Sequence, residues 1–409
     1  MKYEELKLKS GAKLYVLPMP QVQTVALGVH VNVGARDEIW PKEAGLAHAT
    51  EHMLFQGTEE FPDSKSISGH IESVGGMLNA FTWQEMTYYY NRLPCTERER
   101  GFRILSQQLQ KSLFLPEKIT SEMQSIIQET HRANDNPPQF LGYETYKVLY
   151  GDHPLGKRTL GLEESVVGFT KEDFRNFLNK FYYPSNFTFV AVGNIKPREA
   201  KKLFERYFPE STQKPRNARE FLKVSAIPQD TIIQKEIEQA HLFLGTTTCP
   251  SLDRNSVVLD TFKIMIGGGM SFPLFQEVRD KRGLCYEIRA DYNSWSDVGL
   301  FYIYLGTDYK RKEEAKSAVI EVIQNSKKSP DLLEKAKLFA KGTIVSAFED
   351  TENIIRSAGI EITSKGKPRS YQEKIEEIQS ITIEEVEKAV DLYLSPERLT
   401  EISLVPKQK

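Results

Sequence analysis

The sequence predicts an α+β fold made of two similar domains, each a mostly antiparallel sheet with helices packed on one face. Strand hairpins alternate with long amphipathic helices, which is typical of this class, and the same order of elements occurs twice along the chain. Each segment of the first copy has a counterpart in the second. The strand pair at 77–91 corresponds to the one at 284–307, and the helix pair at 97–133 corresponds to the one at 311–348. The helix and strand at 169–194 correspond to those at 381–406.

This repeat divides the 409 residues into a first domain at 1–212 and a second, homologous domain at 224–409, joined by a linker at 213–223. The linker is polar and contains Pro215, which is typical of an exposed connection. A chain of this length can bury a sizeable core in each of two domains.

The first domain begins with alternating apolar and polar residues in 1–33, which predict strands around a turn. A helix is expected between the breaker Pro41 and Gly57, and a second helix at 64–74 precedes the strand pair of residues 77–91. The helix pair 97–133 then completes the first copy of the repeat.

Residues 135–168 are expected to form a loop, because they contain Pro137-Pro138 and the turn residues Gly151-Asp152-His153-Pro154. A helix should start at each of two capping boxes, Thr170 with Asp173 and Thr382 with Glu385. In the second domain, the helix expected at about 253–266 contains no histidine.

The composition excludes several classes of function. The net charge of −2 gives no reason to expect binding to nucleic acid or to an anionic membrane. No apolar run approaches the roughly 18 residues of a membrane span. The first residues alternate like a strand and include acidic side chains, so we expect neither a secretory signal nor a transit peptide there. The three cysteines, Cys95, Cys249 and Cys285, are far apart, which suits a reducing compartment. We therefore expect a cytoplasmic protein.

The motif His48-Ala49-Thr50-Glu51-His52 lies in the helix that follows Pro41. Residues four apart lie on the same face of a helix, so His48 and His52 can bind one zinc ion. Glu51 lies beside His52, where a carboxylate can act as the general base of a metal-assisted hydrolase. The spelling H-x-x-E-H is the inverted form of the commoner zinc-protease motif.

A third ligand is expected from the helix at 118–133. Glu122 and Glu129 are two turns apart and therefore share a face. One of them could bind the metal while the other supports the site through a hydrogen bond. The residues alone do not decide which carboxylate has which role.

The chain resembles the pitrilysin/insulysin family of zinc peptidases, in particular the half-length branch typified by the mitochondrial processing peptidase β subunit. The resemblance extends from about residue 10 to the C-terminus. Besides H-x-x-E-H and Glu129, the matching stretches are Gly75 to Thr82, Glu85 with Thr87 to Tyr89, Asn134 to Pro138, His153 to Gly156, Gly267 to Met270, and Phe275 to Tyr286.

The resemblance implies one zinc ion per chain, held by His48, His52 and Glu129, with Glu51 as the general base and Glu122 in support. It also implies that Arg279 and Tyr286 bind the substrate main chain or its oxyanion from across a clam-shell chamber. Arg282 is close in sequence, and Arg279 and Arg282 both remain candidates for the substrate-facing arginine.

The resemblance further implies that an extended peptide binds along the strand containing Asn79, Ala80, Phe81 and Thr82. Such strand addition relies on main-chain hydrogen bonds and tolerates varied sequences. A homodimer is expected, in which the partner chain completes each active site.

Two functions follow from this interpretation. The first is a zinc endopeptidase that cleaves peptides or unfolded, presequence-like segments, with Glu51 as the base. The second is a non-catalytic scaffold or peptide-capturing subunit, since the family includes members that have lost zinc. The complete set of His48, Glu51, His52 and Glu129 favours the first.

Overall fold

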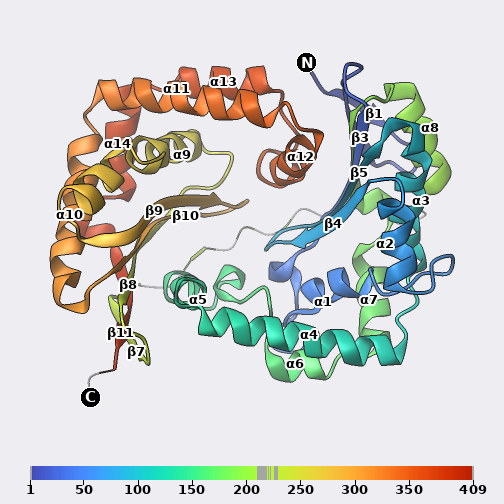
Figure 1. Cartoon of the computed structure of the whole chain (residues 1–409), viewed down its shortest axis with the longest axis horizontal. Coiled ribbons are helices and arrows are strands. Elements are labelled where there is room, and N and C mark those ends of the chain that lie inside the picture. The colour runs from blue at the N-terminus through green and yellow to red at the C-terminus, as the bar shows by residue number, and fades with distance from the viewer. Residues whose placement is uncertain (1, 210–218, 220, 222, 225–228, 408–409) are drawn as a thin grey trace. The chain divides into compact units, whose positions relative to one another are not determined.

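The computed structural model describes residues 2–209, 219, 221, 223–224 and 229–407 of the chain (Figure 1). The predicted linker at 213–223 lies mostly outside the described residues. The chain forms two compact units, which are not continuous in sequence. The first unit contains Met1–His131, Lys157–Glu220 and Ala347–Tyr371, and the second contains Arg132–Gly156, Phe221–Ser346 and Gln372–Lys409.

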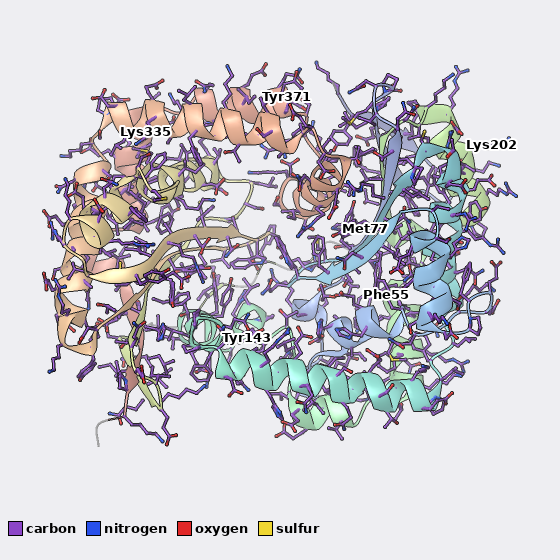
Figure 2. The ribbon with its side chains drawn as sticks, in the orientation of Figure 1. Phe55, Met77, Tyr143, Lys202, Lys335 and Tyr371 are labelled. Carbon is purple, nitrogen blue, oxygen red and sulfur yellow. The ribbon has the colours of Figure 1, made fainter. Side chains whose placement is uncertain are left out.

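The first unit is built on a six-stranded sheet in the order β1-β2-β6-β3-β5-β4. Its strands are β1 (Glu4–Lys7), β2 (Lys13–Pro18), β3 (Thr24–Val31), β4 (Met77–Thr82), β5 (Thr87–Pro94) and β6 (Phe187–Gly193). Only β2 and β6 pair in parallel, so the sheet is mostly antiparallel, as predicted. Met77, labelled in Figure 2, marks the start of the edge strand β4.

Most helices of the first unit belong to a core on one face of this sheet. They are α1 (Leu46–Met53), α2 (Ser64–Glu72), α3 (Arg98–Lys111), α4 (Pro116–Asp135), α6 (Glu163–Val167), α7 (Lys171–Phe181) and α8 (Pro197–Tyr207). Because side chains alternate along a strand, Leu27 and Val29 of β3 point into this core, together with Phe102 of α3.

The opposite face of the same sheet is covered by α12 (Thr351–Lys365), which comes from the second half of the sequence. The Nε2 atom of His30 lies 2.8 Å from Oγ1 of Thr363 on α12. A Cβ atom at Gly359 would come within 2.9 Å of the Tyr88 ring. Only a glycine therefore allows α12 to pack so closely against this face.

The second unit repeats the arrangement on a five-stranded sheet in the order β7-β11-β8-β10-β9. Its strands are β7 (Thr231–Lys235), β8 (Ala240–Thr248), β9 (Cys285–Ser294), β10 (Gly299–Thr307) and β11 (Thr400–Pro406), and only β7 and β11 pair in parallel. Its helices are α5 (Pro137–Tyr150), α9 (Arg254–Gly267), α10 (Lys312–Ser326), α11 (Pro330–Ala347), α13 (Tyr371–Gln379) and α14 (Ile383–Tyr393).

The two faces of this second sheet also have separate cores. Leu242 and Leu244 of β8 pack with α9, α10 and α14, whereas Phe243 packs with Leu141 and Leu149 of α5. Helix α5, on which Tyr143 is labelled in Figure 2, comes from the first half of the sequence. Each sheet therefore has helices from its own half on one face and a helix from the other half on the opposite face.

Helix α5 corrects the loop that we expected at 135–168. The two prolines that suggested a loop occupy the first turn of the helix, where a missing N–H costs no hydrogen bond. The side chain of Asn136 caps this turn by accepting the N–H of Gln139 at 3.0 Å. Both predicted capping boxes are present, at Thr170 in α7 and at Thr382 in α14.

No helix in the described part of the chain combines the length and the apolar character needed to cross a bilayer.

Candidate metal centre

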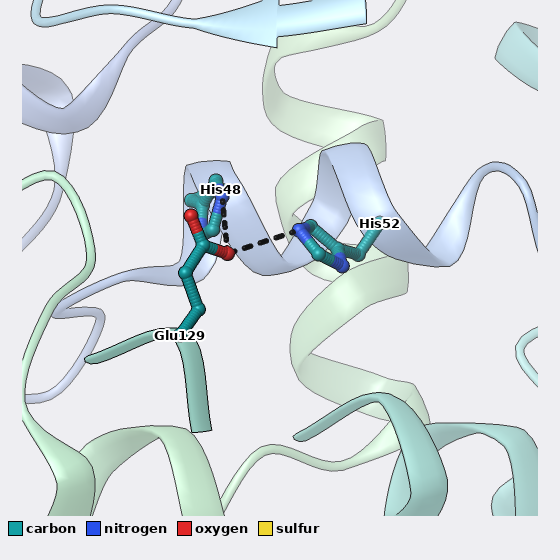
Figure 3. A group of neighbouring side chains, drawn as sticks. All are labelled: His48, His52 and Glu129. Atoms are coloured by element: carbon teal, nitrogen blue, oxygen red, sulfur yellow. Dashed lines mark ion pairs between the residues drawn. The ribbon is translucent and has the colours of Figure 1, made fainter. Parts of the chain in front are cut away.

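Helix α1 places the two histidines of the motif on one face (Figure 3). It begins after Gly45, whose φ of +91° is readily adopted by glycine, and it is shorter than the expected helix between Pro41 and Gly57. The ring centroids of His48 and His52 lie 4.6 Å apart. His48 is buried, and His52 is half-buried.

Glu129 of α4 approaches both rings. Its Oε2 lies 3.8 Å from Nε2 of His48 and 3.8 Å from Nε2 of His52 (Figure 3). The three donor atoms all lie within 4.8 Å of one another. The structure thus brings together His48, His52 and Glu129, which are separated by up to 81 residues (129 − 48) in the sequence.

Two imidazole nitrogens and one carboxylate oxygen are the kinds of ligand that zinc prefers, and the distances from Glu129 to the two histidines suit a shared ion. Two ligand atoms that are each about 2.1 Å from one zinc ion can lie up to about 4.2 Å apart, and the 3.8 Å separations fall within that limit. Burial lowers the pKa of His48 to about 3, and the neighbouring His52 contributes to the shift. His48 is therefore neutral at pH 7, which is the form that binds a metal.

Glu122, two turns before Glu129 on α4, bonds to the other side of His52. Its Oε2 lies 3.2 Å from Nδ1 of His52. A proton on Nδ1 makes this hydrogen bond and leaves the Nε2 lone pair facing Glu129. Burial alone would lower the pKa of His52, but the bond to Glu122 and the charges of Glu51 and Glu129 outweigh it and raise this pKa.

Glu51 is held by the strand next to the helix. Oγ1 of Thr82, the last residue of β4, donates a hydrogen bond to Oε2 of Glu51 at 2.5 Å. Burial raises the pKa of Glu51, while the bond from Thr82 opposes the rise. A carboxylate with a raised pKa is better suited to take up a proton near neutral pH. We expected Thr82 to bind substrate but did not foresee this contact, because it depends on how β4 packs beside α1.

Comparison with known proteins is consistent with this geometry. Residues 16–162 match the family described as insulinase (peptidase family M16), and residues 168–340 match the peptidase M16 inactive domain. A relative from Rickettsia felis, described as an uncharacterized zinc protease, is 31% identical over 93% of this chain and 92% of its own length. The chain belongs to peptidase family M16.

A further relative and two solved structures are also similar to nearly the whole chain, and the solved structures agree with the predicted fold. The Bacillus subtilis protein YmxG, also described as an uncharacterized zinc protease, is 28% identical over 92% of both chains. The solved structure of a Helicobacter pylori protease matches with a TM-score of 0.88 at 19% identity over 99% of both chains. A Pseudomonas fluorescens structure described as a peptidase M16 inactive domain matches with a TM-score of 0.89 at 21% identity, over 100% of this chain and 99% of its own.

The predicted peptide-binding residues of this M16 chain lie on the edge strand β4. Asn79, Ala80, Phe81 and Thr82 pair with β5 on one side, and among the described strands β4 has β5 as its only neighbour. The Asn79 side chain accepts the N–H of Ala80 at 2.8 Å. An edge strand next to Glu51 has the backbone groups that an extended peptide could pair with.

Arg279 and Tyr286 lie in the second unit, whereas the candidate metal ligands His48, His52 and Glu129 lie in the first. Arg279 is near the end of the short π-helix Leu274–Asp280, and its guanidinium carbon is 4.6 Å from the Phe275 ring centroid and 4.7 Å from that of Tyr286. Tyr286 is 79% exposed. Arg282 instead pairs with Glu321 at 2.7 Å.

Proposed function

We propose that the protein is a zinc-dependent endopeptidase that cleaves peptides or unfolded, presequence-like segments. The observation that carries this proposal is the convergence of His48, His52 and Glu129 on one point, with Glu51 held beside them. Membership of the M16 family, whose relatives are described as zinc proteases, supports it. The proposal includes one zinc ion per chain.

His48, His52 and Glu129 would hold the metal, and Glu122 would keep His52 in the correct tautomer. When bound, zinc lowers the pKa of a coordinated water to about 7 and polarises the peptide carbonyl. Glu51 accepts the proton of the attacking water and delivers it to the leaving amine nitrogen. Thr82 holds one oxygen of Glu51 in place and so orients the carboxylate for both transfers.

The substrate would bind as an additional strand along Asn79, Ala80, Phe81 and Thr82. Main-chain pairing requires an extended segment and gives little preference for particular side chains. Arg279 and Tyr286 would bind the substrate main chain or stabilise the oxyanion. The contact of Arg282 with Glu321 favours Arg279 for this role.

Cleavage of an internally quenched peptide by the zinc-loaded protein tests this function. We expect the wild type to cleave the peptide, and E51Q to bind the same amount of zinc but to lose activity. A folded wild type that binds zinc, cleaves no member of a broad peptide library and still captures peptides would contradict the proposal. That result would favour the non-catalytic, peptide-capturing role.

We further propose that the protein is a cytoplasmic homodimer in which Arg279 and Tyr286 of one chain serve the metal centre of the other. Mixing E51Q with Y286F tests this arrangement. If the sites form between chains, a mixed dimer contains one intact site, and about a quarter of the wild-type activity should return in a random mixture. If each site forms within one chain, the mixture should stay inactive.

A further inference from the structure

The side chain of Glu38 binds the N-terminal end of α1, the helix that carries both histidines. Its Oε2 accepts the N–H of Gly45 at 2.9 Å, and its Oε1 accepts the N–H of Ala47 at 2.8 Å. Glu38 is only 8% exposed and directly follows the helical turn Ala35–Asp37. Burial raises the pKa of Glu38 well above its usual range, and the two hydrogen bonds from Gly45 and Ala47 oppose this rise. Both oxygens of the carboxyl group act as acceptors here.

His48 lies in the part of α1 that most needs such support. It is the third residue of a helix of eight, and the N–H groups of a first turn lack partners within their own helix. The residue at the N-cap position is Gly45, which has no side chain to bind them. Glu38 therefore performs from a distance the function that a capping side chain normally performs locally.

Close backbone packing holds the same turn from another direction. A Cβ atom at Gly45 would lie 2.8 Å from the carbonyl oxygen of Leu160, and one at Gly161 would lie 2.3 Å from that of Ala44. The turn that leads into α1 is thus held by Glu38 and by the backbone at residues 160–161. A small shift of this turn would move His48 directly, because only two residues separate it from Gly45.

We propose that Glu38 is a positioning residue of the metal centre, which fixes the first turn of α1 so that His48 points to the site shared with His52 and Glu129. The inference rests on the proposed zinc-dependent function. Because Glu38 is not itself a ligand, its substitution should weaken metal binding while all three donor side chains remain.

The substitution E38Q tests this role through metal affinity. A glutamine has one acceptor oxygen and one NH₂ group, so it cannot accept both backbone N–H groups. We expect Zn²⁺ to bind roughly 10–100-fold more weakly, which is typical for loss of a group that orients a ligand. The affinity is measured by competition with a chromophoric chelator. With Co²⁺ as the probe, the visible absorption spectrum should also change, because it reports the geometry of the ligands.

E43Q is the matched control. Glu43 belongs to the same segment, and its side chain accepts one backbone N–H, that of Ile39 at 3.0 Å, which lies outside α1. E43Q makes the same chemical change without loosening the helix end, so it should bind Zn²⁺ like the wild type. E38D keeps the carboxyl group on a shorter side chain, so its Zn²⁺ affinity should lie between those of the wild type and E38Q.

If E38Q does not fold, amide hydrogen exchange in the wild type still tests whether Glu38 binds the N–H groups of Gly45 and Ala47. The amides of Gly45 and Ala47 should exchange as slowly as that of Ala49, which donates to the carbonyl of Gly45 at 2.9 Å. Wild-type Zn²⁺ affinity in E38Q and E38D, or rapid exchange of both amides, would overturn the role of Glu38. A wild type that binds Zn²⁺ but cleaves no peptide would instead overturn the endopeptidase proposal and leave the affinity comparison valid.

Discussion

At the scale of single residues, the hydroxyl of Thr82 orients Glu51 by donating a hydrogen bond to its carboxylate. This contact joins the edge strand to the proposed general base at 2.5 Å. A residue expected to line the peptide-binding edge therefore also orients the carboxylate. Substrate binding and proton transfer would then depend on the same end of β4.

Substitution T82A should lower kcat for peptide cleavage roughly tenfold to a hundredfold, because a hydrogen bond to a charged group contributes about 1.5–3 kcal/mol. The zinc content should stay unchanged, since Thr82 binds no proposed ligand. T82S retains the hydroxyl and should keep most of the activity. Equal kcat values for T82A and T82S would show that the hydroxyl does not orient Glu51.

The buried side chain of His30 should make the free energy of unfolding depend on pH, and His30 is not part of the metal centre. Burial lowers its folded-state pKa from 6.5 to about 3, and Arg219 contributes to the shift. Between these values the unfolded chain binds a proton that the folded chain does not. The free energy of unfolding should therefore fall as the pH drops below about 6.5, by up to about 1.4 kcal/mol per pH unit.

Substitution H30Q should remove this part of the pH dependence. Urea unfolding of the metal-free protein between pH 7 and pH 5 should show a smaller loss of stability for H30Q than for the wild type. An unchanged pH slope in H30Q would mean that His30 is protonated in the folded protein.

At the scale of elements, the sequence predicted the start of a helix correctly where the capping residues are close neighbours in the chain. The capping boxes at Thr170 and Thr382 marked the starts of α7 and α14 correctly. The proline pair at 137–138 led to the wrong prediction of a loop, because proline is common both in loops and in the first turn of a helix. The capping residue Asn136 was the signal that could have distinguished the two.

Substitution N136A should destabilise α5, because it removes the cap that accepts the N–H of Gln139. The expected loss is about 0.5–2 kcal/mol, measured as a lower urea midpoint for the second unit, to which α5 belongs. N136D retains a capping oxygen and should stay close to the wild type. A midpoint for N136A equal to that of N136D would contradict the capping role.

At the scale of the whole molecule, the two units exchange helices between the two halves of the sequence. The first unit needs α12 to cover His30 and Tyr88, and the second needs α5 to cover Phe243. The repeat in the sequence predicted two similar sheets, but it could not predict this exchange. A repeat shows which elements are alike, whereas their partners depend on which apolar faces meet in the folded chain.

Separation of the halves should therefore destabilise both. A fragment of residues 1–209 lacks α12, so it should expose apolar surface and bind a hydrophobic dye. Co-expression with residues 229–409 should restore a stable complex, detected by co-purification and by loss of dye binding. An isolated 1–209 fragment that unfolds at the same urea concentration as the intact chain would contradict the need for exchanged helices.

Much of the candidate site could be predicted from the sequence, because its donors follow a simple rule of spacing. His48, Glu51 and His52 lie on one helix, and the same spacing rule placed Glu122 and Glu129 on one face of another helix. The choice of Glu129 as the ligand came from the family resemblance and not from the spacing. The contacts of Thr82 with Glu51 and of Glu38 with α1 could not be predicted in the same way. Each contact depends on how two separate elements pack together. Nearly every residue has a backbone N–H group, so the sequence does not show which of these groups Glu38 binds.

The zinc content of the purified protein tests the metal centre most directly. Mass-spectrometric metal analysis should find one zinc ion per wild-type chain and far less in E129Q, which loses a charged ligand. H131Q, with its change two residues away on the same helix, should retain one ion per chain. No zinc in the folded wild type, or a full complement in E129Q, would show that His48, His52 and Glu129 do not form the metal site.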